Sequence, residues 1–87
     1  MKTIVFDETC IGWSEIPEHN ERYLRLQREH LNDLLIYRRY LYLNVIYESF
    51  GVKWNPDDKN ICYLAEFGPI GIEFQSIGEG KYLVHID

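Results

Sequence analysis

Three histidines and two cysteines are the residues in this chain best suited to catalysis, and their spacing argues against a reaction. No two histidines stand four residues apart, the spacing that lets two imidazoles of one helix bind a metal ion, and the cysteines form no Cys-x-x-Cys pair. A dyad of Cys62 and His85 on neighbouring strands would place a thiol beside a base, but nothing marks an activated thiol. We therefore expect no catalytic residue, no metal site, no cofactor and no enzymatic activity. The residues weighed are His19, His30, His85, Cys10 and Cys62.

The segment Gly78-Glu79-Gly80-Lys81 has the glycines and lysine of a phosphate-binding loop. That motif also needs a glycine five residues before its last glycine and a Ser or Thr after the lysine, where this chain has Gln75 and Tyr82. The segment predicts a hairpin turn instead.

Acidic residues gather in the second half of the chain. From residue 44 onward there are seven acids against three lysines, a charge of −4 within a chain of −5. Glu66 and Glu73 are expected on strands joined by a short turn, so that they share one face with Glu79 nearby. Such an array would steer the domain towards a basic surface on another protein, whereas the alternative is that the acids only keep it soluble. The acids expected to contribute are Asp57, Asp58, Glu66 and Glu73.

Arginines form a stripe in the first half, at Arg22, Arg25 and Arg28. Residues 17–43 carry five arginines against four acids, a surplus of only one positive charge. A nucleic-acid-binding regulator acting through this stripe is an alternative, but a clustered basic footprint is what such domains show. We therefore do not expect direct nucleic-acid binding.

Aromatic residues make up 15% of the chain, and their placement indicates an interface. Four tyrosines between residues 37 and 47 cannot all face one core from a helix, so some rings are expected on the surface, where they mark protein contacts. Tyr40 and Tyr42 are our candidates for a homodimer seam. Trp54, in a segment rich in turn residues, is our candidate for an anchor on a partner.

The elements that must position these residues begin with a strand over 2–6 and a helix from Pro17 to about residue 37, whose leucines recur at helical spacing. Between them Cys10, Ile11 and Trp13 are expected to fold back on the domain. Two arrangements then compete: one helix over 17–49, or a break near residues 38–39 and a second short helix capped by Asn44. We favour the break, because an unbroken helix would span about 48 Å. Gly51 ends the helical part in either case.

The last third predicts strands over 61–67, 72–75 and 81–86, forming an antiparallel meander with the first strand added at an edge. The expected fold is α+β, with one long or broken helix packed on an antiparallel sheet of three or four strands.

Length and composition predict a single domain over residues 1–87. The 46% hydrophobic content is that of a folded protein. No run approaches the roughly 18 apolar residues of a membrane span, and the N-terminal apolar run stops at Asp7, short of a signal peptide. Two unpaired cysteines indicate reduced thiols, so we expect a cytoplasmic protein and no membrane partner.

One stretch of the chain is similar to known proteins. The run Leu31-Asn32-Asp33-Leu34-Leu35, followed by Tyr40-Leu41-Tyr42-Leu43-Asn44-Val45-Ile46-Tyr47 and Phe50-Gly51, resembles small uncharacterised proteins of phages and prophages of Gram-positive bacteria. It covers roughly residues 30 to 75, and Arg39 stands where the glycine of the break is expected. The resemblance implies no activity. It implies a phage accessory protein, located in the cytoplasm of the host bacterial cell. Small acidic phage proteins of this kind often bind a host defence or replication protein, including CRISPR effectors and restriction enzymes.

Together these observations predict a small acidic, non-enzymatic protein-binding module, a phage-encoded anti-defence or anti-CRISPR inhibitor that covers a basic surface on a CRISPR effector or other nuclease. A structural or assembly homo-oligomer is the second hypothesis, and the nucleic-acid-binding regulator is the third.

Overall fold

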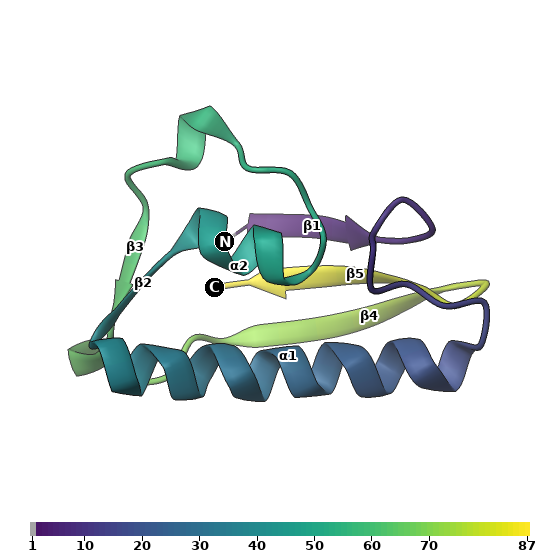
Figure 1. The fold of residues 1–87 in the computed structure, drawn as a ribbon, viewed down its shortest axis with the longest axis horizontal. Coiled ribbons are helices and arrows are strands. Elements are labelled where there is room, and N and C mark those ends of the chain that lie inside the picture. The colour runs from purple at the N-terminus through teal and green to yellow at the C-terminus, as the bar shows by residue number, and fades with distance from the viewer. Residues whose placement is uncertain (1) are drawn as a thin grey trace.

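The two ends of the chain form the larger sheet of the structure, a computed structural model that describes residues 2–87 (Figure 1). Its strands are β1 (Lys2–Phe6), β4 (Ile72–Gly78) and β5 (Lys81–Ile86), in the order β1-β5-β4 and all antiparallel. The predicted hairpin turn joins β4 to β5, with positive φ angles at Gly78, Glu79 and Gly80. The first strand lies at an edge, as the sequence predicted.

The first helix, α1 (Pro17–Arg38), begins at the predicted proline and lies along the sheet (Figure 1). Its Leu24, Leu31 and Leu35 are buried, and burying a leucine side chain contributes about 1.5 to 3 kcal/mol. The helix ends because Arg39 turns into the left-handed region with φ 73°, where its amide still reaches the Leu35 carbonyl.

The helix breaks after Arg38, which confirms the predicted arrangement of two helices. After it come β2 (Tyr40–Tyr42) and α2 (Leu43–Ser49), followed by Gly51 with φ 77°. The predicted cap is wrong, because Asn44 lies inside the first turn of α2 and its side chain is used elsewhere. Its amide oxygen accepts the Asn55 backbone N–H at 2.8 Å, and its amide nitrogen donates to the Asn55 carbonyl at 3.1 Å.

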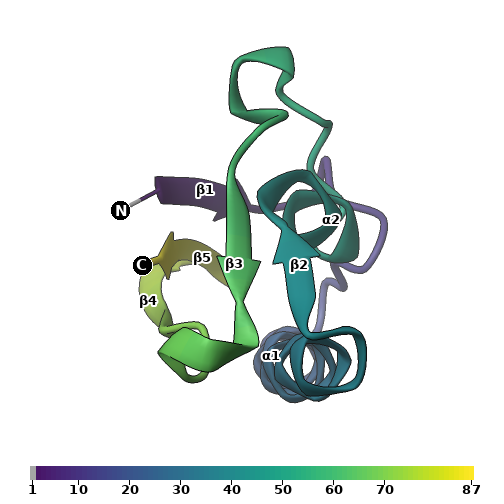
Figure 2. The ribbon, with the colours of Figure 1, turned by 90° about the vertical axis from the view of Figure 1, so that its left-hand side faces the viewer.

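The predicted meander is also wrong, although the α+β class is confirmed. The third strand, β3 (Cys62–Leu64), pairs with β2 in a separate two-stranded ribbon and not with β4 (Figure 2). Two short 3-10 helices flank it, η1 (Pro56–Asp58) and η2 (Ala65–Phe67). Because η2 and Gly68, with φ 90°, turn the chain away from the strand direction, β3 cannot continue as a hairpin into β4.

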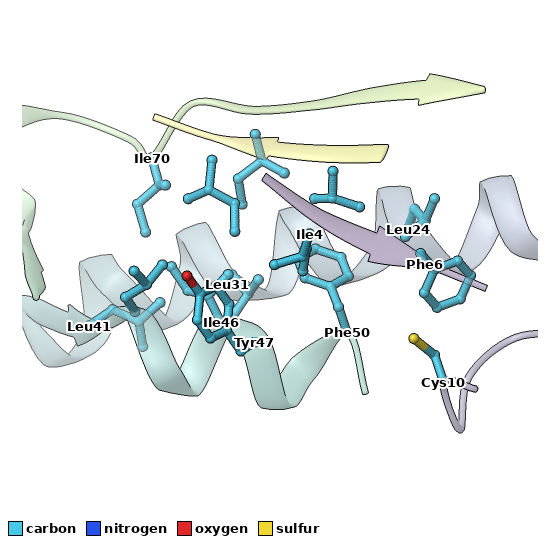
Figure 3. Close-up of a cluster of buried hydrophobic side chains, with 14 of the residues drawn as sticks. Ile4, Phe6, Cys10, Leu24, Leu31, Leu41, Ile46, Tyr47, Phe50 and Ile70 are labelled. Atoms are coloured by element: carbon cyan, nitrogen blue, oxygen red, sulfur yellow. The ribbon is translucent and has the colours of Figure 1, made fainter. Parts of the chain in front are cut away.

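A continuous core lies between the helices and the inner face of the larger sheet (Figure 3). Aromatic rings join its parts: Phe6 stacks on Tyr23 with ring centroids 5.6 Å apart, and Phe50 meets Phe74 edge to face at 6.3 Å. Such pairs add about 0.5 to 1.5 kcal/mol beyond their buried area. The two helices and the sheet are therefore one packing unit.

The segment between β1 and α1 folds back as expected, with one exception. Cys10 is buried, and the Trp13 indole N–H donates to the Gly80 carbonyl at 3.2 Å. The buried Asn20 side chain donates to the same carbonyl at 3.0 Å, so this segment is tied to the β4–β5 turn. The expectation for Ile11 is wrong: it is 97% exposed, in the turn directly after the buried Cys10.

Among residues 2–87 no helix has the length and apolar content needed to cross a membrane.

Candidate protein-binding surface

The two-stranded ribbon presents an apolar face to solvent. Its register pairs Tyr40 with Leu64 and Tyr42 with Cys62, so these four side chains lie on one side, and all four are exposed. Leu41 alternates to the other side and is buried against the helices. The sequence Tyr-Leu-Tyr thus packs one residue in the core and sends two outward. We call Tyr40, Tyr42, Cys62 and Leu64 the ribbon surface.

The two tyrosines of the ribbon surface are the expected exposed rings. They are 47% and 46% exposed, and their ring centroids lie 5.8 Å apart, edge to face. This arrangement holds each ring in place without covering it. The ribbon surface lies at the end of the molecule where α1 ends, with β2 and β3 side by side (Figure 2).

Two further exposed aromatics lie in elements directly next to the ribbon in the sequence. Phe67, in η2 directly after β3, is 81% exposed, and Tyr37, in the last turn of α1, is also exposed. Phe67 forms part of the wall of a hollow of about 300 Å³ beside β3, which we call the β3 hollow. Its lining is mostly apolar and comes from β3, the turn after η2 and the C-terminal residue: Cys62, Tyr63, Leu64, Phe67, Gly68, Pro69, Ile70, Gly71 and Asp87.

Trp54 belongs to a second apolar patch. Its indole N–H donates to the Glu48 carboxylate at 3.0 Å, and its ring is exposed. With Ile11 it lines a shallow depression of about 470 Å³ that shares no residue with the β3 hollow. Trp54 and the β3 hollow are therefore separate features of the surface.

Asp58 is not a surface acid, contrary to the sequence prediction. The residue is 4% exposed, and its carboxylate pairs with the Lys2 ammonium at 2.9 Å and accepts the Tyr47 hydroxyl at 2.9 Å. The Asn55 amide donates to it at 3.3 Å. The hydrogen bond from Lys2, and then that from Tyr47, lowers the pKa of Asp58 below its usual value. This carboxylate holds β1, α2 and η1 together and is not available to a partner.

Asp57, its neighbour, points to solvent. Its backbone N–H donates to the Asn55 side-chain oxygen at 3.0 Å, which caps η1 and leaves the carboxylate at the surface.

The predicted array of three glutamates does not form. Glu66 is exposed on η2, not on a strand, whereas Glu73 is exposed on β4 and lines a shallow hollow together with Arg25 and Arg28. Glu79 lies past the other end of β4, about 20 Å from Glu73 at 3.3 Å per residue, and is 3.8 Å from the Lys81 ammonium. Only Glu66 therefore borders the β3 side of the molecule, because it adjoins Phe67 in η2.

The arginine stripe is largely used within the fold. Arg25 pairs with Glu21 at 2.6 Å, one turn earlier on α1. Arg28 donates to the Ile72 carbonyl at 3.2 Å, and its guanidinium carbon lies 4.9 Å from the centre of the Phe74 ring. Arg28 thus fastens α1 to β4, which reduces the basic surface left for a phosphate backbone.

The thiol and imidazole considered as a dyad belong to different sheets. The ring nitrogens of His85 on β5 lie 3.0 Å from the Thr3 hydroxyl oxygen and 3.0 Å from the Gln75 side-chain oxygen, while Cys62 is on β3. No group of three or more His, Cys, Asp or Glu side chains able to hold a metal ion occurs in the part of the chain that the structure describes.

The sequence missed the pairing of β2 with β3, which joins the predicted tyrosines to Cys62 and Leu64. The only signal was the alternation in Tyr40-Leu41-Tyr42, too short to distinguish a strand from a helical turn. Comparison of the chain with protein families, with curated proteins and with solved structures found no match.

Proposed function

We propose that this domain is a non-enzymatic protein-binding module, a phage-encoded inhibitor that covers a basic surface on a host defence or nucleic-acid-handling protein. The observation that supports it best is the ribbon surface, where two tyrosines, a leucine and a cysteine lie side by side in solvent. Tyrosines held by neighbours bind at low entropic cost, because few rotamers are lost on docking.

The contact with the partner must extend beyond the ribbon surface. A stable interface buries about 800 Å² on each partner, more than four side chains supply. Phe67 and Tyr37 extend the apolar centre, and Glu66 and the more distant polar residues would form its rim. The partner therefore covers the whole end of the molecule where α1 ends.

Charge supports the basic partner. The chain carries −5, which raises the rate of encounter with a positive surface and opposes approach to nucleic acid. Sites that bind nucleic acid are the usual positive surfaces of proteins. A CRISPR effector or another nuclease is the class of target this predicts.

The test is an affinity capture of the tagged domain from a Gram-positive host lysate, treated with nuclease before elution. We expect the unmodified domain to capture a nucleic-acid-handling protein. The control variant Leu26→Ser, which removes an exposed leucine of α1, should capture the same protein. The double variant Tyr40→Ser/Tyr42→Ser is expected to lose it. Each hot-spot residue contributes about 2 kcal/mol or more, so the loss of affinity should exceed a hundredfold. A captured protein held equally by both variants contradicts the proposal.

A homodimer through Tyr40 and Tyr42 is the second candidate, because the same exposed ring pair is self-complementary about a two-fold axis. Light scattering after size exclusion separates the two candidates. A dimer mass that falls to a monomer mass in the double tyrosine variant supports the homodimer. A monomer mass for the unmodified chain excludes the homodimer and keeps the inhibitor as the candidate function.

A further inference from the structure

The outer edge of β3 carries backbone groups that its own sheet does not use. The Leu43 N–H donates to the Ile61 carbonyl and the Ala65 N–H to the Arg39 carbonyl, which fixes the residues of the ladder that exchange hydrogen bonds. Because such pairs recur at every second residue of an antiparallel ladder, Leu41 and Tyr63 are the hydrogen-bonded pair between them.

The residues on either side of Tyr63 therefore point their backbone groups away from β2. Cys62 and Leu64 each present one N–H and one C=O to the outer edge. The Leu64 carbonyl is the acceptor with which η2 begins, because Leu64 is the N-cap of that helix. The other three groups have no hydrogen-bonding partner within residues 2–87. An unpaired edge of this kind is a template for a strand from another chain.

The β3 hollow lies along this edge. Cys62, Leu64 and Phe67 line it together with Gly71 and Asp87, and the Asp87 N–H donates to the Gly71 carbonyl at 2.9 Å. In Figure 2 the C-terminal end of β5 lies on the side of β3 that faces away from β2. At about 300 Å³ the hollow is at the small end of the range of ligand sites, which suits side chains of an extended peptide.

We infer that the β3 edge and the β3 hollow bind an extended, basic segment of the target by strand addition. This inference rests on the proposed function and specifies how the target is held. Residues i and i+2 of the segment pair with the backbone of Cys62 and Leu64. An apolar side chain of residue i+1, or of a residue next to this pair, enters the hollow. A lysine or arginine of the segment pairs with Asp87.

Charge selects this occupant over a second copy. Among residues 2–87, Asp87 is the only charged residue lining the hollow, and Glu66 adjoins Phe67 in η2. Pairing β3 with β3 of another copy would bring two Asp87 carboxylates, and two chains of −5, to one interface. A basic segment instead neutralises these acids.

The test uses six-residue peptides in which lysine alternates with Val, Leu, Ile or Phe, and a matched set with glutamate in place of lysine. Backbone hydrogen exchange followed by NMR reports protection of the Cys62 and Leu64 amides, and fluorescence anisotropy gives the affinity. We expect the lysine set to protect both amides and to bind at least tenfold tighter than the glutamate set. Methylating the peptide backbone nitrogens that face β3 should abolish binding.

The variant Asp87→Asn is expected to weaken the lysine peptides about two- to fivefold, as an exposed ion pair does. Asp33→Asn, an exposed acid on α1, should leave them unchanged. The inference is overturned if no peptide protects the two amides, or if both peptide sets bind equally, or if protection arises from dimerisation of the chain alone.

The two proposals fail separately. A captured host target that depends on Tyr40 and Tyr42 but leaves the Cys62 and Leu64 amides exchanging freely in the complex keeps the proposed function and overturns strand addition. If peptides protect these amides but no host target is captured, strand addition is supported and the proposed inhibitor function is contradicted.

Discussion

The hydroxyl of Tyr47 donates to the carboxylate of Asp58 at 2.9 Å, which joins α2 to η1 eleven residues further along the chain. The same carboxylate reaches the Lys2 ammonium at 2.9 Å, so three segments far apart in sequence meet at one buried charge. The pKa of Tyr47 is raised and that of Asp58 is lowered, so this contact is sensitive to both alkaline and acid pH.

Alkaline pH should destabilise the domain through Tyr47. Burial, and then the hydrogen bond to Asp58, raises the pKa of Tyr47 to about 12, whereas the unfolded value is about 10. A raised folded pKa contributes stability that is present below pH 10 and is lost as the pH rises towards 12. We expect Tyr47→Phe to lower the free energy of unfolding at pH 7 by about 1 to 2 kcal/mol and to flatten this alkaline loss.

Urea unfolding between pH 7 and pH 11.5 measures both effects. Burial also raises the pKa of Tyr23 and of Tyr63, so part of the slope should remain in Tyr47→Phe. Tyr37→Phe, at an exposed ring, is the control and should behave as the unmodified chain. Parallel alkaline profiles for Tyr47→Phe and the unmodified chain would contradict the assignment.

Acid should destabilise the domain through Asp58. The Lys2 ammonium and the Tyr47 hydroxyl hold the pKa of this carboxyl below its usual value, so its contribution is present above pH 4 and is lost as the pH falls through the folded pKa. We expect Asp58→Asn to lower the melting temperature at pH 7 and to weaken the fall in melting temperature between pH 5 and pH 2. Thermal scans followed by circular dichroism test it.

The neighbouring Asp57→Asn is a matched control, since its carboxylate is exposed and should change neither value. Asp7, whose pKa is lowered by the hydroxyl and the backbone N–H of Thr9, acts in the same direction and accounts for the acid sensitivity that Asp58→Asn retains. Equal effects of the two substitutions at 57 and 58 would show that the buried ion pair does not stabilise the fold.

Glycine at position 39 should stabilise the protein. Arg39 has a φ of 73° at the end of α1, where the left-handed conformation costs a residue with a Cβ about 1 to 2 kcal/mol. The greater freedom of glycine in the unfolded chain offsets about 0.5 to 1 kcal/mol of this. We expect Arg39→Gly to raise the melting temperature by a few degrees.

Arg38→Gly is the matched substitution inside the helix, and it should cost about 1 kcal/mol. A calorimeter measures both melting temperatures. Equal destabilisation by the two glycines would mean that residue 39 does not carry the left-handed turn in solution.

The two cysteines should react at very different rates in the folded protein. Cys62 is exposed on the ribbon surface, while Cys10 is buried and its thiol lies 3.7 Å from the Val5 carbonyl. We expect one equivalent of a maleimide to add quickly at Cys62, and the second to add only in denaturant. Peptide mass spectrometry locates the adducts, and rapid double labelling of the native chain would contradict the burial of Cys10.

The sequence predicted those elements whose signal is local. Proline at residue 17 and the leucine spacing placed α1, and strand propensity with a following turn placed β1. The break after residue 38 was favoured on length alone, because no glycine marks it. Arg39 takes the left-handed turn without one.

Long-range pairing was beyond local reasoning. The ribbon joins Tyr40–Tyr42 to Cys62–Leu64 across twenty residues, and the meander was predicted because consecutive strands usually pair. Likewise Asp58 lies in a segment of turn residues that looked solvated, and its cation, Lys2, is fifty-six positions away. The exposure of Tyr40 and Tyr42 was predicted from the number of tyrosines in that stretch, because four rings between residues 37 and 47 cannot all face one core.

The larger sheet also sets the order in which the domain is completed during synthesis. β1 is made before β5, and among the described strands β1 pairs with β5 alone. While the ribosome makes the residues between them, Ile4 and Phe6 have no strand beside them to close the core. The sheet therefore forms after residues 81–86 have left the exit tunnel, in one late and cooperative step.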